Sequence, residues 1–513
     1  MLEQGYAEKV PTNEPTLEQG KVWYIPHHGV RHPTKGKLRV VFDCGCTYKG
    51  ISLNSQLLQG PDFTNTLIGV LLRFREEPIA VMADINAMFH QVRVPYKHVN
   101  FLCFLWWPNG DATVEPEEYR MCVHLFGAVS SPSCSNYALR RTAEDNALQY
   151  SPDVLRTVKT NFYVDDCLKS TVTEEDAVKL IHGLTSLKRH LSKGSFHLQK
   201  WVTNNSNVFA LIPSKIRAVG LENMDLDRDQ LPVERALGMQ WCVQGDTFSF
   251  RTAVQERPHT RRGILSVVSS LYDPLGFLSP FIIPAKLLLQ ELCRMNFKWD
   301  EPVRHDVSEH WSEWLSELQH MSGFKVERCI KPKNFGTQVK AELHHFSDAS
   351  QTGYGTVSYL RLESTDNVHV SFITGKARVA PLKQLTIPRL ELAAAVLAVR
   401  VNTMLLKELQ LPLQRSFFWT DSTTVLKYIF NETKRFHTYV ANRVSTIRES
   451  TDKDQWRYVN TKDNPADEAS RGLRAQEFGK GKWLKGPDFL HLPPPGGRNS
   501  TWTPLPFHLM MQR

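Results

Sequence analysis

The segment NFYVDD, residues 161–166, decides the interpretation of this sequence. An apolar stretch ends there in two adjacent aspartates, Asp165 and Asp166. A second apolar run, IAVMADI at residues 79–85, is typical of a buried strand and carries Asp84 near its end. A sheet that places these two strands side by side would bring three carboxylates together.

Three carboxylates at such short range raise one another's pKa, and bound divalent cations keep them ionised. Two Mg²⁺ ions about 3.5–4 Å apart can activate a 3′-hydroxyl and stabilise a leaving pyrophosphate. The cluster therefore predicts nucleotidyl transfer. The competing interpretation is that an aspartate at a strand end forms a turn, which is the commoner role for an isolated residue. An adjacent pair between apolar stretches fits that role less well.

Length and composition are those of a multidomain globular protein. The 513 residues suggest three or four domains, and 22% charged with 41% hydrophobic residues is ordinary for folded proteins. Lysine and arginine total 62 against 53 acidic residues, and this excess of nine positive charges favours a polyanionic partner such as nucleic acid.

Several other classes of protein do not fit this sequence. No apolar run reaches the roughly 18 residues of a membrane span, and the first residues lack the pattern of a signal peptide. The nine cysteines show no paired spacing typical of a zinc site. We therefore expect an intracellular protein with reduced thiols, neither secreted nor membrane-bound.

A second set of acidic residues follows in the C-terminal half. Its members are Asp348 in HHFSDAS, Glu391 in IPRLEL, Asp421 in FFWTDS and Asp467 in DNPADEASRG. Two of them end apolar strands, one opens an apolar helix and the last lies just ahead of a final helix, so all four can converge at one edge of a sheet. Taken singly, each could instead be a strand-end turn residue or a helix cap, and Glu391 could simply favour a helix dipole.

These motifs resemble a known family. YVDD at 163–166, ADINAMF at 83–89 and FGAVSSP at 126–132 resemble the palm of a reverse transcriptase, and the four later acids resemble those of an RNase H domain. Five further segments are most similar in sequence to the BEL/Pao group of long-terminal-repeat retrotransposons, namely WYIPHHGV, LRVVFDC, SLNSQLLQGPD, LLRFREEPIAVMADI and FHLQKWVTN. The resemblance extends from about Trp23 to Gly472, and it implies a fragment of a polyprotein whose peptidase lies upstream and whose integrase lies downstream.

The resemblance implies a multidomain α/β (α+β) fold with reverse transcriptase fingers, palm and thumb followed by an RNase H-like domain. The expected segments are an N-terminal lead-in at 1–20, fingers and palm at 21–245, a helical thumb or connection at 246–335, the RNase H-like domain at 336–475, and a tail rich in proline and glycine at 476–513.

The activity implied is that of an RNA-directed DNA polymerase, a nucleotidyltransferase, with a ribonuclease H endonuclease that hydrolyses RNA in hybrids. Its partners would be an RNA template, a DNA primer, RNA–DNA hybrid and deoxynucleoside triphosphates (dNTPs), with two Mg²⁺ ions per active site and Mn²⁺ as an alternative. The expected location is the cytoplasm, in a virus-like particle, or the nucleus. The oligomeric state is left open.

The resemblance also implies the roles of the first metal site and its surroundings. Asp84, Asp165 and Asp166 would hold the metals together with the backbone carbonyl of Ile85, and Phe89 would collide with a ribose 2′-hydroxyl and so select deoxynucleotides. The further expected contacts with nucleotide or primer are Arg39 and its neighbour Lys37 at the triphosphate, Gly127 beside the nucleotide, Tyr163 near the primer end, and Lys200 as the proton donor to pyrophosphate.

One departure from the retroviral pattern lies beside Gly127, because Phe126 stands where retroviral enzymes have glutamine. In the second site the family uses Asp348, Glu391, Asp421 and Asp467 to bind two Mg²⁺ ions, one activating water and the other supporting the leaving 3′-oxygen. The segment Leu237–Trp241 resembles a primer-gripping hairpin. Basic helices carrying Arg257, Arg261 and Arg262 would contact duplex phosphates without sequence preference.

Two alternatives remain open from the sequence. A decayed or domesticated copy could bind nucleic acid without catalysis, although all seven expected metal ligands are present. An aspartic peptidase is suggested faintly by Asp348-Ala-Ser and Asp421-Ser-Thr, but neither segment has the glycine that permits the tight backbone approach around paired aspartates in such enzymes.

Overall fold

The computed structural model describes residues 1–11, 20–31, 38–186, 196–218, 233–332, 335–336 and 338–493. The chain forms two compact units, the first from residues 1–70 and 81–227 and the second from residues 71–80 and 228–513. Sheets and helices occur in both, so the predicted mixed α/β character is confirmed. Among the described residues, no helix combines the length and the apolar character needed to cross a bilayer. Lys37 lies outside the described residues.

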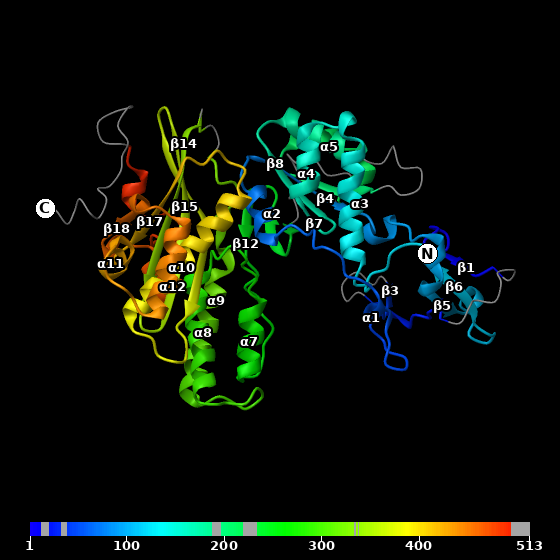
Figure 1. Ribbon diagram of the computed structural model, residues 1–513, viewed down its shortest axis with the longest axis horizontal. Coiled ribbons are helices and arrows are strands. Elements are labelled where there is room, and N and C mark those ends of the chain that lie inside the picture. Colours follow the sequence, from blue (N-terminus) through cyan, green and yellow to red (C-terminus); the bar gives the residue numbers. More distant parts are fainter. Residues whose placement is uncertain are drawn as a thin grey trace. The chain divides into compact units, whose positions relative to one another are not determined.

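The first unit is built on a four-stranded sheet. Its order is β7 (Phe162–Tyr163), β8 (Asp166–Thr171), β4 (Ile79–Ile85) and β9 (Leu198–Thr203). β4 lies in the interior of the sheet, and its apolar side chains are buried, as the continuous apolar run predicts. The helices α3 (Ser131–Asp145), α4 (Pro152–Thr160) and α5 (Glu174–Ser186) accompany this sheet (Figure 1).

The boundary between α4 and β7 follows from local sequence. Ser151 accepts a hydrogen bond from the backbone N–H of Val154, and Pro152 opens the helix, which are both typical of a helix N-terminus. The helix continues to Thr160, so Val158 belongs to its buried face and the following strand begins only at Phe162.

Smaller sheets complete the first unit. They are β1 (Ala7–Lys9), β6 (Glu117–Met121) and β5 (Cys103–Trp106) in that order, and the hairpin of β2 (His27–Arg31) with β3 (Leu38–Phe42). The short helices are α1 (Leu53–Gln56), α6 (Ser206–Leu211) and the first turn of α2 (Leu67–Phe74). β1 lies within the segment predicted as a solvated lead-in, and Ala7 is buried opposite Met121. A strand of three residues is too short to give a periodic pattern.

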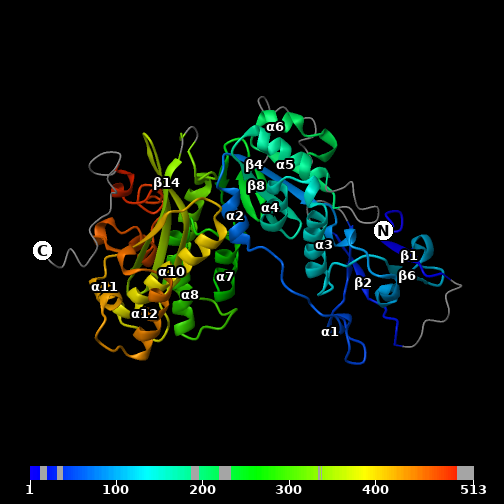
Figure 2. The same cartoon turned by 45° about the horizontal axis from the view of Figure 1, so that its top comes forward.

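The second unit contains a five-stranded sheet of order β16 (Val368–Val379), β15 (Gly353–Ser364), β14 (Gln338–Ala349), β17 (Arg415–Thr420) and β18 (Trp456–Tyr458). β14 is antiparallel to β15 and parallel to β17, so β14 and β17 end at the same edge. The helices α10 (Ile387–Glu408), α11 (Thr423–Phe430) and α12 (Thr438–Ser450) lie beside this sheet in both views (Figures 1 and 2). A shared core of apolar side chains from α10, α11, α12, β17 and β18 holds them there.

A second sheet and three helices precede the five-stranded sheet. The strands are β10 (Val233–Ala236), β11 (Met239–Cys242), β12 (Thr247–Ser249) and β13 (Lys325–Glu327), and the helices are α7 (Arg261–Ser270), α8 (Ser279–Arg294) and α9 (His305–His320). The predicted boundary at residue 245 differs from this grouping. β11 pairs with β12 across that point and β12 pairs with β13, so all four strands belong to the second unit.

The C-terminal segment differs from the predicted tail at 476–513. After α13 (Ala466–Arg471), Trp483 and Leu490 are buried, and the Trp483 indole N–H donates to the Phe277 carbonyl at 2.8 Å. Isolated anchoring residues in a stretch rich in proline and glycine produce no hydrophobic period, so composition alone indicates a linker. Residues 494–513 lie outside the described part of the chain.

Candidate active sites: two carboxylate clusters

The first cluster forms where two elements of the four-stranded sheet meet. Asp84 lies on β4 opposite Gln199, Asp165 lies in the turn between β7 and β8, and Asp166 begins β8. The backbone N–H of Ile85 donates to the carbonyl of Asp165 at 2.8 Å. This bond ties the end of β4 to the turn and holds the aspartates near one another.

The turn that carries Asp165 has an unusual backbone. Tyr163 pairs with Asp166, so Val164 and Asp165 form a two-residue loop, and Val164 has a φ of 56°. Glycine or asparagine normally takes such a position, because a β-branched side chain is strained there by about 1–3 kcal/mol. The strands β7 and β8 on either side hold the turn in this strained conformation, and this turn sets the direction of the Asp165 and Asp166 side chains.

Charge crowding is evident in the first cluster. Burial and the charge of Asp84 raise the pKa of Asp165. Burial and then the charges of Asp165 and Asp84 raise the pKa of Asp166 to about 7. Lys200, on β9, forms an ion pair with Asp84 and partly offsets the repulsion. The cluster thus holds more negative charge than its single paired cation balances.

The other residues expected in this region are spread over several elements. Phe89 is buried, and its ring centroid lies 4.5 Å from that of Phe126. Gly127 has a φ of 105°, and a Cβ there would come within 2.9 Å of the Phe42 carbonyl oxygen, so only glycine fits. Tyr163 is half-buried on β7. Arg39 is exposed on the β2–β3 hairpin, and it is not among the charges that shift the pKa values of Asp165 and Asp166.

The second cluster is tighter than the first. Asp348 lies near the end of β14 and Asp421 directly follows β17, and Glu391 comes from the start of α10. One carboxylate oxygen from each of these three residues lies within 4.8 Å of the other two. Across the described ranges, no other three histidine, cysteine or acidic residues place ligand atoms so close together.

Burial and charge repulsion oppose ionisation in this cluster, in which Asp348 and Glu391 are buried and Asp421 is half-buried. Burial, followed by the charges of Asp348 and Asp421, raises the pKa of Glu391 to about 9. Burial is also the main cause that raises the pKa of Asp348 to about 6. Glu391 is 8% exposed, and its Oε2 atom has no hydrogen-bond partner. A buried oxygen of this kind normally binds a donor or a cation.

Asp467 completes the predicted set at a greater distance. It lies in the first turn of α13, and its side chain forms an ion pair with Arg471 at 2.6 Å. Its charge contributes to the raised pKa values of Asp348 and Glu391. The structure therefore brings three of the four acids into direct proximity and places the fourth within electrostatic range.

The second cluster fits divalent cations. Its ligand atoms are carboxylate oxygens, which Mg²⁺ and Mn²⁺ prefer, and the unpartnered Oε2 of Glu391 is oriented by a rigid helix. Asp348, Glu391 and Asp421 would bind the cation directly, with Asp467 adjacent. In the first cluster, Asp84, Asp165 and Asp166 offer the same donor chemistry over a wider spacing.

Sequence reasoning missed two polar residues that contact the second cluster. The hydroxyl of Ser470 donates to Asp348 Oδ2 at 2.5 Å, and the amide of Asn464 donates to Asp421 Oδ1 at 3.4 Å. Both belong to the segment DNPADEASRG that carries Asp467. Ser470 is three residues after Asp467 in a helix, and this spacing, which places both on one face, could have indicated it.

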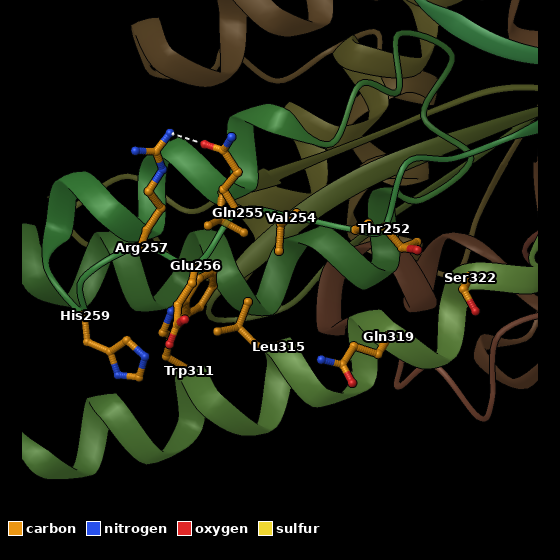
Figure 3. Close-up of a pocket in the computed structure, with 12 residues that line it drawn as sticks. Thr252, Val254, Gln255, Glu256, Arg257, His259, Trp311, Leu315, Gln319 and Ser322 are labelled. Atoms are coloured by element: carbon orange, nitrogen blue, oxygen red, sulfur yellow. Dashed lines mark hydrogen bonds between the residues drawn. The ribbon is translucent and has the colours of Figure 1, made fainter.

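The arginines expected to contact duplex phosphates lie in the helical part of the second unit. Arg262 pairs with Asp300, Arg261 lies 4.1 Å from the centroid of the Trp299 ring, and Arg257 is exposed. Figure 3 shows Arg257 in the extended segment that lines a groove of about 550 Å³ beside α9, where its guanidinium donates to Gln255. The lining of this groove contains none of the clustered acids.

The raised pKa of Glu391 predicts how stability depends on pH. Between pH 5 and 9 the metal-free native state holds a proton that the unfolded chain has released, so the free energy of unfolding should fall as pH rises, by at most about 1.4 kcal/mol per pH unit. Stabilisation by Mg²⁺ or Mn²⁺ should grow over the same range, because the cation replaces that proton. Thermal unfolding at pH 6, 7, 8 and 9, with chelator or with cation, measures both trends.

The matched control for this titration is Glu391→Gln, which removes the ionisable group at nearly constant volume. The metal-free variant should be more stable than the wild type at pH 8 and should show a shallower pH dependence. A wild-type slope that Glu391→Gln leaves unchanged would contradict the assignment.

One segment of the chain matches a known domain family. Residues 260–422, about a third of the chain, match the Pao retrotransposon-like RNaseH-like domain. This range contains Asp348, Glu391 and Asp421. No curated protein matches the sequence.

Solved structures of a foamy viral protease-reverse transcriptase share the fold. One of them, in complex with double-stranded DNA, has 14% identity and a TM-score of 0.55 over 90% of this chain and 68% of its own. A second, in complex with an RNA/DNA hybrid, has 14% identity and a TM-score of 0.52 over 90% of this chain and 52% of its own, so this chain spans about half of its length. A third, in complex with double-stranded DNA, has the same identity and a TM-score of 0.52, with 90% of this chain and 80% of its own covered.

At this identity the structural likeness shows the fold alone, and the predicted multidomain α+β class is confirmed. Residues 260–422 are thus similar to a Pao retrotransposon-like domain, in line with the resemblance of the sequence motifs to this group, and the likeness to the solved structures extends to the fold.

Proposed function

We propose that this Pao/BEL-type retroelement chain is an RNA-directed DNA polymerase with ribonuclease H activity. In this proposal the first unit synthesises DNA and the five-stranded sheet of the second unit cleaves the RNA strand of the hybrid. Segments 21–245, 246–335 and 336–475 would serve as fingers and palm, as thumb or connection, and as the RNase H-like domain, with β10 and β11 assigned to the second unit.

The observation that carries this proposal is the second cluster. Three carboxylates, two of them buried and that of Asp421 half-buried, have oxygens within 4.8 Å of one another inside the segment that matches an RNaseH-like domain, and Glu391 has an oxygen without a partner. Burying such a set without a cation is unfavourable, because like charges repel and desolvation penalises each. A fold keeps this arrangement where a reaction needs it.

At the nuclease site the protein would bind and orient. Asp348, Glu391 and Asp421 would hold the cations at one sheet edge, and Asp467 would extend the set toward solvent. Bound Mg²⁺ would lower the pKa of the attacking water and stabilise the departing 3′-oxygen. RNA in the hybrid would be recognised by its shape and 2′-hydroxyls.

At the polymerase site, the turn at Val164 would fix Asp165 and Asp166 opposite Asp84 for the same kind of binding. Lys200 would give a proton to the leaving pyrophosphate, and its ion pair with Asp84 supports this role. Phe89, with Phe126 against its ring, would form the wall that excludes a ribose 2′-hydroxyl. Arg39 and Lys37 would contact the triphosphate, with Gly127 beside the nucleotide and Tyr163 near the primer end.

The test uses the full chain with two substrates. With Mg²⁺ we expect incorporation of dNTPs on a primed RNA template and cleavage of RNA in an RNA–DNA hybrid, both lost on adding chelator. Mn²⁺ should replace Mg²⁺ in both assays. Both activities should weaken as salt rises, because phosphate contacts release counterions.

The possible results separate the competing functions. Salt-sensitive hybrid binding without either activity would favour a catalytically silent nucleic-acid-binding protein. Cleavage of protein without added metal would favour an aspartic peptidase. The proposed place of action is the cytoplasm, in a virus-like particle, or the nucleus.

A further inference from the structure

The short helix α13 lies unusually close to the sheet that carries Asp348. A Cβ on Gly355 would come within 2.6 Å of the Ala469 Cβ, and one on Gly353 within 2.8 Å of the Ser470 carbonyl oxygen. Both glycines are in β15, and Gly355 is the direct neighbour of Asp348 across the ladder. Two positions without a side chain therefore let the helix backbone reach the strand pair next to this carboxylate.

Ser470 uses this approach to contact the cluster. Its side chain is fully buried, and its hydroxyl lies 2.5 Å from Asp348 Oδ2 and 3.1 Å from the Asp467 carbonyl oxygen. The carboxylate is the nearer and the charged acceptor, so it takes the single hydroxyl proton. The backbone carbonyl of Ser470 accepts a hydrogen bond from the Ser350 hydroxyl at 2.9 Å, which fixes the backbone at this position.

Asn464 gives the same segment a second connection. Its buried amide donates to the Ser347 carbonyl at 3.1 Å and lies 3.4 Å from Asp421 Oδ1, while its carbonyl oxygen accepts from the Ala466 backbone at 3.2 Å. One segment of eight residues, 464–471, thus contacts two of the three clustered carboxylates.

The helix is also held from the side away from the cluster. The Glu468 carboxylate accepts from the backbone N–H groups of Lys482 at 2.9 Å and Trp483 at 3.1 Å. Trp483 is buried against the rest of the unit. The position of α13 therefore does not depend on the Asp348 contact, and a change at Ser470 should leave the helix in place.

We infer that Ser470 is a positioning residue for the nuclease site, where its hydroxyl fixes the rotation of the Asp348 carboxylate so that divalent cations bind. The inference rests on the proposed ribonuclease H function. A hydrogen bond to one oxygen leaves the carboxylate enough lone pairs for a cation and removes the freedom to turn away from it. Contacts of this kind behind a metal ligand typically contribute about 10–100-fold to metal affinity or activity.

The test measures Mn²⁺ binding by the full chain without nucleic acid, using electron paramagnetic resonance. All variants carry Asp165→Asn, which weakens the other candidate site. Ser470→Ala should weaken Mn²⁺ binding by about 10–100-fold, and Ser470→Thr, which keeps the hydroxyl, should restore most of it. In the hybrid cleavage assay, Ser470→Ala should raise the Mg²⁺ concentration for half-maximal rate by a similar factor, with most of the rate recovered at saturating Mg²⁺.

Ser445→Ala is the matched control. Ser445 is an exposed serine on α12 whose hydroxyl donates to Glu449 at 2.7 Å, so this variant removes the same type of bond outside the cluster and should leave Mn²⁺ binding unchanged. If Ser470→Ala does not fold, Ser470→Cys keeps the side-chain volume with a weak donor and should also bind Mn²⁺ less tightly.

The outcomes distinguish this inference from the function on which it rests. Wild-type Mn²⁺ affinity in Ser470→Ala or Ser470→Cys would overturn the positioning role, even if cleavage by the wild type is robust. Equal losses in the alanine and threonine variants would also overturn it, because a purely steric effect does not follow the hydroxyl. A parent chain that neither binds Mn²⁺ at this site nor cleaves hybrid would instead refute the nuclease proposal.

Discussion

Asp421→Asn should reduce hybrid cleavage by about a thousandfold, equivalent to roughly 4 kcal/mol of transition-state stabilisation, and should leave DNA synthesis within about twofold of wild type. Asp421 is one of three residues whose oxygens lie within 4.8 Å. Asparagine keeps its shape but removes the charge that binds a divalent cation. Rates of RNA cleavage in a labelled hybrid and of dNTP incorporation, measured on the same preparation, give the result.

We expect Asp421→Asn to lose cleavage without losing stability. The charge of Asp421 helps to raise the pKa values of Glu391 and Asp348, so removing it relieves repulsion in the metal-free protein. The melting temperature of Asp421→Asn without metal should therefore equal or exceed that of the wild type. A variant that melts normally and still cleaves at the wild-type rate would refute the proposed role of the second cluster.

The reciprocal substitution completes the separation. Asp165→Asn should lose about a thousandfold in DNA synthesis and retain hybrid cleavage, because Asp165 belongs to the first cluster. Asp153→Asn, an exposed aspartate in the first turn of α4, is the control and should retain both activities. If either active-site variant lost both activities together, one shared site would replace the two proposed here.

The sequence predicted the positions of these carboxylates because each lies at an element boundary that local patterns reveal. Asp84 and Asp348 lie near the ends of buried strands, and Glu391 near the start of an apolar helix. Hydrophobic period and strand ends depend on neighbouring residues, so a single sequence shows them. The order of those strands within each sheet was not predicted, and it comes from the structure.

What the sequence could not reveal depends on contacts between distant residues. Ser470 contacts Asp348 across 122 positions, and Trp483 donates to Phe277 across 206. The spacing from Asp467 points to the helix face of Ser470, but no local pattern identifies the distant partner of either residue. The left-handed backbone of Val164 was equally hidden, because valine is among the residues least expected there.

Residues 71–80 are the longest segment whose contacts the sequence could not reveal. They lie between two parts of the first unit in sequence and belong to the second unit. The Arg75 guanidinium is buried and donates to the carbonyls of Arg328, Ile373 and Phe372 at 2.8–3.0 Å. Arg73 forms a buried ion pair with Glu408. Local sequence patterns cannot anticipate arginines that donate to backbone carbonyls some 250 to 300 residues away.

Arg328 also contacts residues of the segment 71–80, and replacing its side chain should strongly destabilise the protein. It is fully buried, binds Asp246 through two parallel bonds of 2.6 and 2.7 Å, and donates to the carbonyls of Glu77 and Pro78 at 3.0 and 2.9 Å. Arg328→Met would leave the Asp246 charge and these carbonyls without their donor. Removing one partner of a buried ion pair typically costs about 3–5 kcal/mol, and we expect the unfolding free energy to fall by that amount.

Urea unfolding of the full chain, followed by tryptophan fluorescence, measures this loss, and Trp241 is a suitable reporter because its ring lies 5.1 Å from that of Phe74 within the same packed segment. Arg262→Met is the control, since both Arg262 and its partner Asp300 are exposed and the transition should not move. A shift for Arg328→Met no larger than that of the control would show that the buried pair does not form in solution.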